Sequence, residues 1–81
     1  MDWTSVWWTV AVPHRRDEPA ADGEHVAEVP GVQWFEIRAL NAQDAIDEAR
    51  TELLSPASVR HRRGARADIA AATAQVSDRQ T

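Results

Sequence analysis

Alternating apolar side chains mark the beginning of the chain. From Trp3 to Val12 the residues alternate, so that one face carries Val6, Trp8, Val10 and Val12 and the other mixes tryptophan with small and polar residues. Because successive side chains of a strand point to opposite faces, this period of two predicts a β-strand. Trp7 and Trp8 are then expected on opposite faces. Pro13 is expected to end the strand, since proline donates no backbone hydrogen bond.

The following segment, residues 13–25, is polar and contains two prolines and a glycine, so we predict an exposed loop. Residues Glu24 to Val29 indicate a second short strand, and Val32 to Leu40 indicate a third. Pro30-Gly31 between them fits the turn of a hairpin. The alternative is that the chain bends here within one long strand.

The strand predicted at residues 32–40 also has two different faces. Phe35, Ile37 and Ala39 are uniformly apolar, whereas the alternate positions mix apolar and charged side chains. We therefore expect Trp8 to share a core with Phe35 and Ile37. The opposite face is expected to carry the remaining large apolar side chains, which are Trp3, Trp7, Val32 and Trp34.

The helical pattern is clearest over residues 42–54. Asn41 fits the N-cap, and Asp44 three residues later resembles a capping box. Ser55-Pro56 is expected to end the helix. Apolar residues recur at helical spacing and form one stripe, which is expected to cover the core face of the sheet. Its members are Ala42, Ala45, Ile46, Ala49, Leu53 and Leu54.

The C-terminal third favours a second helix over residues 65–77, because its apolar positions have helical spacing and alanine has the highest helix propensity. A strand at residues 57–62 or 66–71 is the alternative. The positions with helical spacing are Ala65, Ile69, Ala72 and Val76.

Taken together, these elements predict one small α+β domain over residues 1–77 and a frayed tail at residues 78–81. An antiparallel sheet of two to four strands is covered on one face by the helix at residues 42–54, with a second helix towards the C-terminus.

Composition restricts how this domain can be stabilised and where it acts. The chain has 81 residues and no cysteine, so disulfides and thiolate zinc sites are excluded. The sequence has no apolar run long enough to span a bilayer and does not begin with a signal peptide, which predicts a cytoplasmic protein without membrane contact. A chain of this length buries only a thin core, and association is a common way to add stability.

Candidate catalytic chemistry is sparse. The sequence has no glycine-rich phosphate loop and no evident nucleophile or acid–base pair, so we expect no enzyme. If the hairpin forms, His25 lies opposite Glu36 as a surface pair. The spacing of acids and histidines in the polar segment matches no metal-binding pattern, so no metal or cofactor is expected. These residues are His14, Asp17, Glu18, Asp22, Glu24 and His25.

Charge is unevenly distributed along the chain. The formal net charge is -4, yet residues 60–81 hold five arginines against two acids. Their basic cluster could contact nucleic-acid phosphates, or it could neutralise the acidic helix of the same or a second chain. We do not favour nucleic acid, because the rest of the chain would repel a phosphate backbone. The cluster consists of Arg60, His61, Arg62, Arg63 and Arg66.

The four tryptophans carry the strongest functional signal. Three of them fall on the face opposite the helix, and tryptophan is enriched at the centres of protein interfaces. We therefore expect a non-catalytic interaction protein that forms a homodimer or binds another protein. Trp7 and Trp34 are predicted at or beside the dimer interface.

Two resemblances agree with a binding role. Val29-Pro30, followed by a strand and the helix start at residues 41–45, resembles the HicB-like antitoxin domains, although Gln33-Trp34 stands where that family has a second Pro-Gly. That resemblance implies a small β–α domain that masks a toxin ribonuclease. The helix from Ala42 to Arg50 is similar to those of short accessory proteins encoded by bacteriophages of GC-rich actinobacteria. This second class implies binding to itself or to a host or phage protein.

Overall fold

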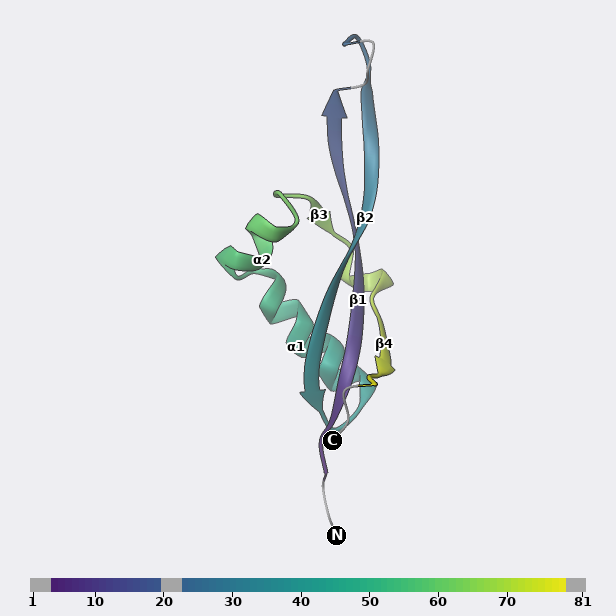
Figure 1. Ribbon diagram of the computed structural model, residues 1–81, viewed down its shortest axis with the longest axis vertical. Helices are drawn as coiled ribbons and strands as arrows, with labels where there is room; N and C mark the ends of the chain where they lie inside the picture. Colours follow the sequence, from purple (N-terminus) through teal and green to yellow (C-terminus); the bar gives the residue numbers. More distant parts are fainter. Residues whose placement is uncertain (1–3, 20–22, 79–81) are drawn as a thin grey trace.

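A four-stranded antiparallel sheet with helices on one face forms the structure (Figure 1), a computed structural model that describes residues 4–19 and 23–78. β1 lies in the middle, with β2 on one side and β3 and β4 on the other. The predicted α+β class is confirmed. The elements in order are β1 (Val6–Pro19), β2 (Val26–Ala39), α1 (Ala42–Leu53), α2 (Pro56–His61), β3 (Arg66–Ala67), the 3-10 turn η1 (Ile69–Ala71) and β4 (Thr73–Val76).

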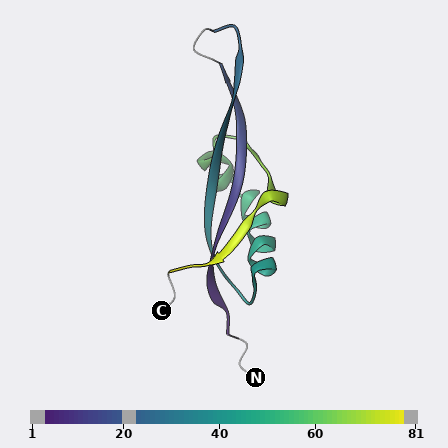
Figure 2. The ribbon, with the colours of Figure 1, turned by 90° about the vertical axis from the view of Figure 1, so that its right-hand side faces the viewer.

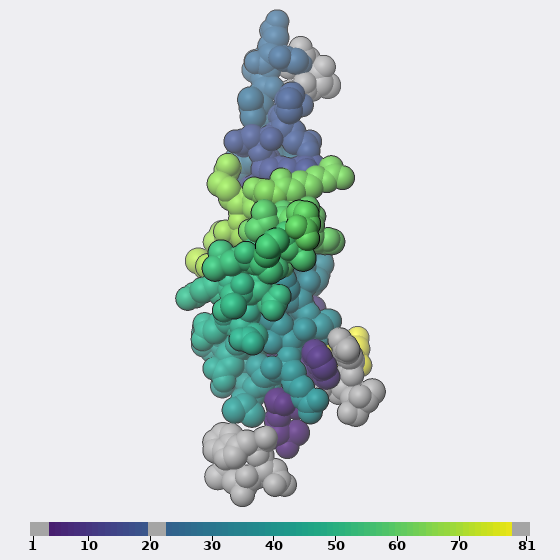
Figure 3. All heavy atoms as spheres, turned by 90° about the vertical axis from the view of Figure 1, so that its left-hand side faces the viewer, coloured from purple at the N-terminus to yellow at the C-terminus, as the bar shows by residue number. Residues whose placement is uncertain are grey.

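β1 and β2 form one long hairpin that extends beyond the helices (Figures 1 and 3). The two strands pair without a slip, from Val6 opposite Ala39 to Pro19 opposite Val26. The molecule therefore measures 61 × 22 × 21 Å. Figure 1 shows α1 and α2 together on one side of the hairpin, and in Figure 2, turned by 90°, they lie behind it. In the part of the chain that the structure describes, no α-helix lies against the opposite face. The helices thus cover one face of the sheet, and the opposite face, which no described helix covers, is called the bare face below.

Pro13 does not end β1, and the exposed loop predicted for residues 13–25 is wrong up to Pro19. The Pro13 carbonyl accepts a hydrogen bond from the Asp68 amide, at 2.8 Å, on the side away from β2. The N and O atoms of a strand residue point to the same side, so the proline nitrogen also points away from β2. Pro13 therefore removes no hydrogen bond from the β1–β2 ladder, and the strand continues.

Pro30-Gly31 does not form a turn, and the predicted hairpin at this position is wrong. The alternative of one long strand is confirmed, because Pro30 pairs with Arg15 within the β1–β2 ladder. By the same alternation, the Pro30 nitrogen points to the outer edge of β2, where proline is tolerated. The expected pair of His25 and Glu36 is also wrong, since Glu36 lies opposite Thr9.

The predicted helix at residues 42–54 is confirmed as α1. The Asn41 side chain caps it by accepting a hydrogen bond from the Asp44 amide at 2.9 Å. Leu54 was expected in the apolar stripe but is 78% exposed, because the helix ends one residue earlier. Two alanines on the buried face let the helix approach the sheet closely. The buried core consists of Val10, Val12, Ile37, Ala45, Ala49 and Leu53.

The core face predicted from the strand pattern agrees with the structure. Trp8 and Phe35 are half-buried and pack against the core, together with Ile46 of α1. The Trp8 indole Nε1 donates a hydrogen bond to the Ala39 carbonyl at 3.1 Å. This bond satisfies the polar atom of a side chain that is otherwise packed on apolar groups.

The helix predicted at residues 65–77 is wrong. This segment instead forms β3, η1 and β4, so the alternative strand at residues 66–71 is correct only for Arg66–Ala67. The free side of β1 presents backbone carbonyls that need donors, and the Trp7 carbonyl accepts one from the Ser77 amide at 2.9 Å. This pairing outweighs the helix propensity of alanine.

The second helix lies earlier than predicted, at α2, which excludes the alternative strand at residues 57–62. Ser55 caps α2 by accepting a hydrogen bond from the Ser58 amide at 3.2 Å, and Pro56 occupies its first turn. Ser55-Pro56 therefore ends one helix and begins the next. Of the tail predicted to fray, residues 79–81 lie outside the described residues.

Candidate interaction surfaces

The bare face of the sheet carries a block of four apolar residues, which we call the apolar quartet. Val32 lies opposite Pro13, and Trp34 lies opposite Ala11, so the four side chains share one face of the β1–β2 ladder. Trp34 is 65% exposed and Val32 is 46% exposed. The structure thus places two of the predicted interface residues together in an exposed apolar patch.

Trp7 lies on the same face but not beside the quartet. The pair of Thr9 and Glu36 separates them, joined by a hydrogen bond of 2.8 Å between the hydroxyl and the carboxylate. Trp7 is four residues from Ala11 along β1, or about 13 Å at the usual rise per residue. Its side chain is half-buried. Trp3, the other predicted interface residue, lies outside the described residues.

The arginines predicted to form one basic surface are divided between different environments. Arg60 is exposed in the last turn of α2. Arg66 lies on the bare face, where its guanidinium is 3.6 Å from the Asp17 carboxylate. Arg62 and Arg63 follow α2 on the covered side of the sheet. The four arginines therefore do not form the continuous basic surface that would track a nucleic-acid backbone.

Arg62 is held in place by backbone carbonyls. Its Nη1 donates to the Leu53 carbonyl at 2.8 Å, and its Nε donates to the Ala65 carbonyl at 2.8 Å. The Gln33 side chain accepts a further bond from Nη1 at 3.4 Å. This guanidinium therefore joins the end of α1, the turn after α2 and the sheet.

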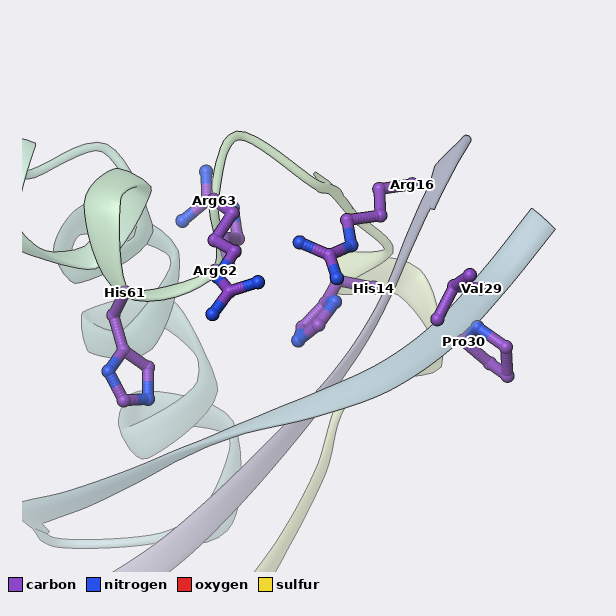
Figure 4. Close-up of a pocket in the computed structure, with 7 residues that line it drawn as sticks. All are labelled: His14, Arg16, Val29, Pro30, His61, Arg62 and Arg63. Carbon is purple, nitrogen blue, oxygen red and sulfur yellow. The ribbon is translucent and has the colours of Figure 1, made fainter. Parts of the chain in front are cut away.

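A hollow of about 190 Å³ lies between the β1–β2 hairpin, around His14 and Val29, and the turn after α2 (Figure 4). The guanidinium groups of Arg16 and Arg62 point towards the His14 ring, with Arg63 and His61 at the rim. None of the described residues that line the hollow is an acid. Its lining consists of His14, Arg16, Val29, Pro30, His61, Arg62 and Arg63.

His14 has an unusual environment for a histidine. It pairs with Gly31 across the ladder, and the ring occupies the space where any other residue at position 31 would place its Cβ. The Nδ1 atom is enclosed and has no hydrogen-bond partner. Burial lowers the pKa of His14 below its usual value, and the positive charges of Arg62, Arg16 and His61 lower it further.

Sequence reasoning missed this hollow because it assigned His14 and Arg16 to a loop. The signal that could have identified them is the continued alternation of β1. Positions 14 and 16 extend the even-numbered face that begins with Val10 and Val12. The sequence pattern identified the arginines after α2 as a cluster. It did not predict that Arg62 and Arg63 line the same hollow as Arg16.

Two further observations concern metal binding and membrane-spanning helices. Within residues 4–19 and 23–78, no group of three or more histidines and acids is placed to hold a metal ion. None of the helices in that part of the chain has the length and apolar character needed to cross a membrane.

Comparison of the chain with protein-family models, with curated proteins and with solved structures finds no match in any of the three. The function is therefore inferred from the apolar quartet on the bare face and from the hollow on the covered face.

Proposed function

We propose that this protein is a non-catalytic interaction protein that acts as a homodimer through the bare face of its sheet. The apolar quartet carries this proposal. A tryptophan exposed by 65% beside an exposed valine, in a chain this small, is typical of an interface rather than of a surface in contact with water. The anchor of the interface is Trp34, and Val32, Ala11 and Pro13 surround it.

The same face has the charge pattern that a self-complementary contact needs. Glu36 and Arg38 follow Trp34 at every second position of β2, so the three exposed side chains lie on the same face. In a two-fold symmetric contact, a patch meets its own copy, so each Glu36 can face Arg38 of the partner subunit. Two stacked sheets lie about 10 Å apart, a gap that large side chains fill.

The shape of the quartet also favours a second copy. Ala11 has the smallest side chain of the four, and it lies directly opposite Trp34. The large indole of Trp34 therefore lies beside the small side chain of Ala11. In a two-fold symmetric dimer, each indole can then pack on the alanine of the partner subunit. No α-helix of residues 4–19 and 23–78 covers this face, and Trp34 and Val32 are exposed on it, so a second copy can approach the quartet.

Light scattering after size exclusion tests the proposal directly. At about 100 μM, a concentration at which a dimer with Kd near 1 μM is almost fully formed, the wild type is expected at twice the monomer mass of 9.0 kDa. Trp34→Ser is expected to give the monomer mass. Leu54→Ser is the matched control, because it removes another highly exposed apolar side chain, at the end of α1. A monomeric wild type contradicts the proposal, as does a dimer that both substitutions leave unchanged.

Trp7→Ser measures how far the interface extends. If the contact is centred on the quartet, this variant loses less affinity than Trp34→Ser, because the Thr9–Glu36 pair separates Trp7 from the quartet. The origins suggested by the sequence resemblances, a phage accessory protein or a HicB-like antitoxin, stay predictions. Either one agrees with a small protein that acts by binding.

A further inference from the structure

We infer that the hollow between β1 and the turn after α2 is a binding site for a small oxyanion of the phosphate class. It lies on the covered side of the sheet and is independent of the proposed dimer interface. Two guanidinium groups and an imidazole converge there from separate parts of the chain (Figure 4). They are Arg16 and His14 of β1 and Arg62 of the turn.

The first argument for an anion site is that positively charged side chains converge in the hollow and none of the described lining residues is an acid. The protein as a whole carries a formal charge of -4, yet this hollow gathers three arginines and two histidines. Positive groups held close together repel one another unless an anion lies between them. Among the described residues, the carboxylate of Glu18 pairs with one of them, Arg16, from the next position on the same side of β1.

Preorganisation is the second argument. Backbone carbonyls already hold Nε and Nη1 of Arg62, so the guanidinium cannot turn away to relieve the repulsion. Its Nη2 takes part in none of these bonds. Arg16 uses Nη2 for Glu18, which leaves its Nε and Nη1. Donors fixed before binding lose little entropy when the ligand arrives.

The size and the donors of the site select the ligand. At about 190 Å³, the hollow is smaller than the pockets of roughly 300 Å³ or more that enclose drug-sized molecules. Guanidinium groups match the oxygens of phosphate in pairs, and the histidine adds a third donor when it is protonated. Val29 and Pro30 close one side with apolar surface. The ligand is therefore one phosphate group, either inorganic phosphate or the end of a small phosphomonoester.

Phosphate binding should depend on the protonation of His14. The charged groups around it are Arg16 and Glu18 from β1, and His61, Arg62 and Arg63 from α2 and its turn, whereas β2 contributes the uncharged Val29 and Pro30. A bound dianion offsets the positive charges that disfavour imidazolium. Phosphate is therefore expected to raise the pKa of His14 back towards its usual range.

The test is an NMR titration of the full chain with inorganic phosphate at constant ionic strength, following the His14 imidazole signals. We expect saturable shifts in the wild type. Arg16→Gln is expected to weaken binding about ten-fold or more, as for the loss of a hydrogen bond between charged groups. Arg15→Gln is the matched control, because it also removes one arginine and one exposed ion pair, with Glu28, but on the other face of β1. It should change the affinity less than about two-fold.

Further arms identify the source of the phosphate group. Binding of adenosine monophosphate more tightly than inorganic phosphate would assign a phosphomonoester, and equal binding would assign phosphate itself. No saturation at about 10 mM phosphate overturns the proposal, since that corresponds to less than about 3 kcal/mol of binding. Equal losses in Arg15→Gln and Arg16→Gln also overturn it. So does an oligonucleotide that binds with a steep salt dependence and is weakened equally by Arg60→Gln, because such binding would indicate a diffuse nucleic-acid surface.

Discussion

His14 and Gly31 face each other across the β1–β2 ladder, and the imidazole lies where a side chain at position 31 would begin. A Cβ built on Gly31 lies 2.9 Å from His14 Nε2, closer than real Cβ contacts. The glycine is required here for close approach and not for its backbone angles, since its φ is not positive. The same ring also lines the hollow beside the turn after α2.

Gly31→Ala is therefore expected to destabilise the fold by about 1–3 kcal/mol, as overpacking usually does. In a background with His14→Ala the same change should cost much less, because the obstructing ring is gone. Urea denaturation of both single variants and the double variant gives the coupling between them, which should exceed about 0.5 kcal/mol. Additive costs would mean that the ring does not occupy this space.

Adjacent leucines at the end of α1 allow a second test, of the core. Leu53 is 5% exposed and contacts the sheet, whereas Leu54 is 78% exposed. Leu53→Ala is expected to cost about 2–5 kcal/mol, which is a large part of the stability of so small a domain. Leu54→Ala should stay within about 0.5 kcal/mol. Urea melts that rank the two variants in the opposite order would contradict the assigned packing.

The elements that the sequence predicted correctly are those in which local pattern and tertiary environment agree. α1 has a capping residue, a stripe of small apolar residues and an acidic first turn, and the sheet buries the same stripe. The opposition of Trp7 and Trp8 follows from strand geometry alone, so the bare face could be recognised before the fold was known.

The elements that the sequence missed depend on partners distant in the chain. Whether Pro13 and Pro30 interrupt a strand depends on which side of the ladder their nitrogens face, and local sequence does not contain that information. The segment after Gly64 forms strands because β1 presents an open side, although alanine favours helix. The sequence did not predict the hollow for the same reason. Arg16 lies near Arg62 because β1 continues past Pro13, which the local pattern did not indicate.

Arg62 supports a third prediction. Its guanidinium donates to the Leu53 and Ala65 carbonyls from two different nitrogens, a geometry that the single ammonium of lysine does not reproduce. Arg62→Lys keeps the charge but is expected to cost about 1–3 kcal/mol, because these two partly buried carbonyls lose their donors. Arg60→Lys, two residues earlier and exposed, should be neutral within about 0.5 kcal/mol in urea denaturation. Equal stability of the two variants would show that the bonds from Arg62 contribute little.

The pH dependence of stability gives a final prediction from His14. Burial, and then the charges of Arg62, Arg16 and His61, hold the pKa of His14 below its ordinary value of 6.5 in the folded protein. The unfolded chain therefore binds the proton more readily, and stability falls as pH decreases from about 6.5. Urea melts between pH 5 and pH 7.5, in a buffer without phosphate, should show this loss in the wild type and a smaller one in His14→Gln. His61→Gln removes an imidazole from the same hollow but leaves His14 in place, so it should retain most of the dependence. Identical pH profiles for the wild type and His14→Gln would show that His14 titrates alike in the folded and unfolded states.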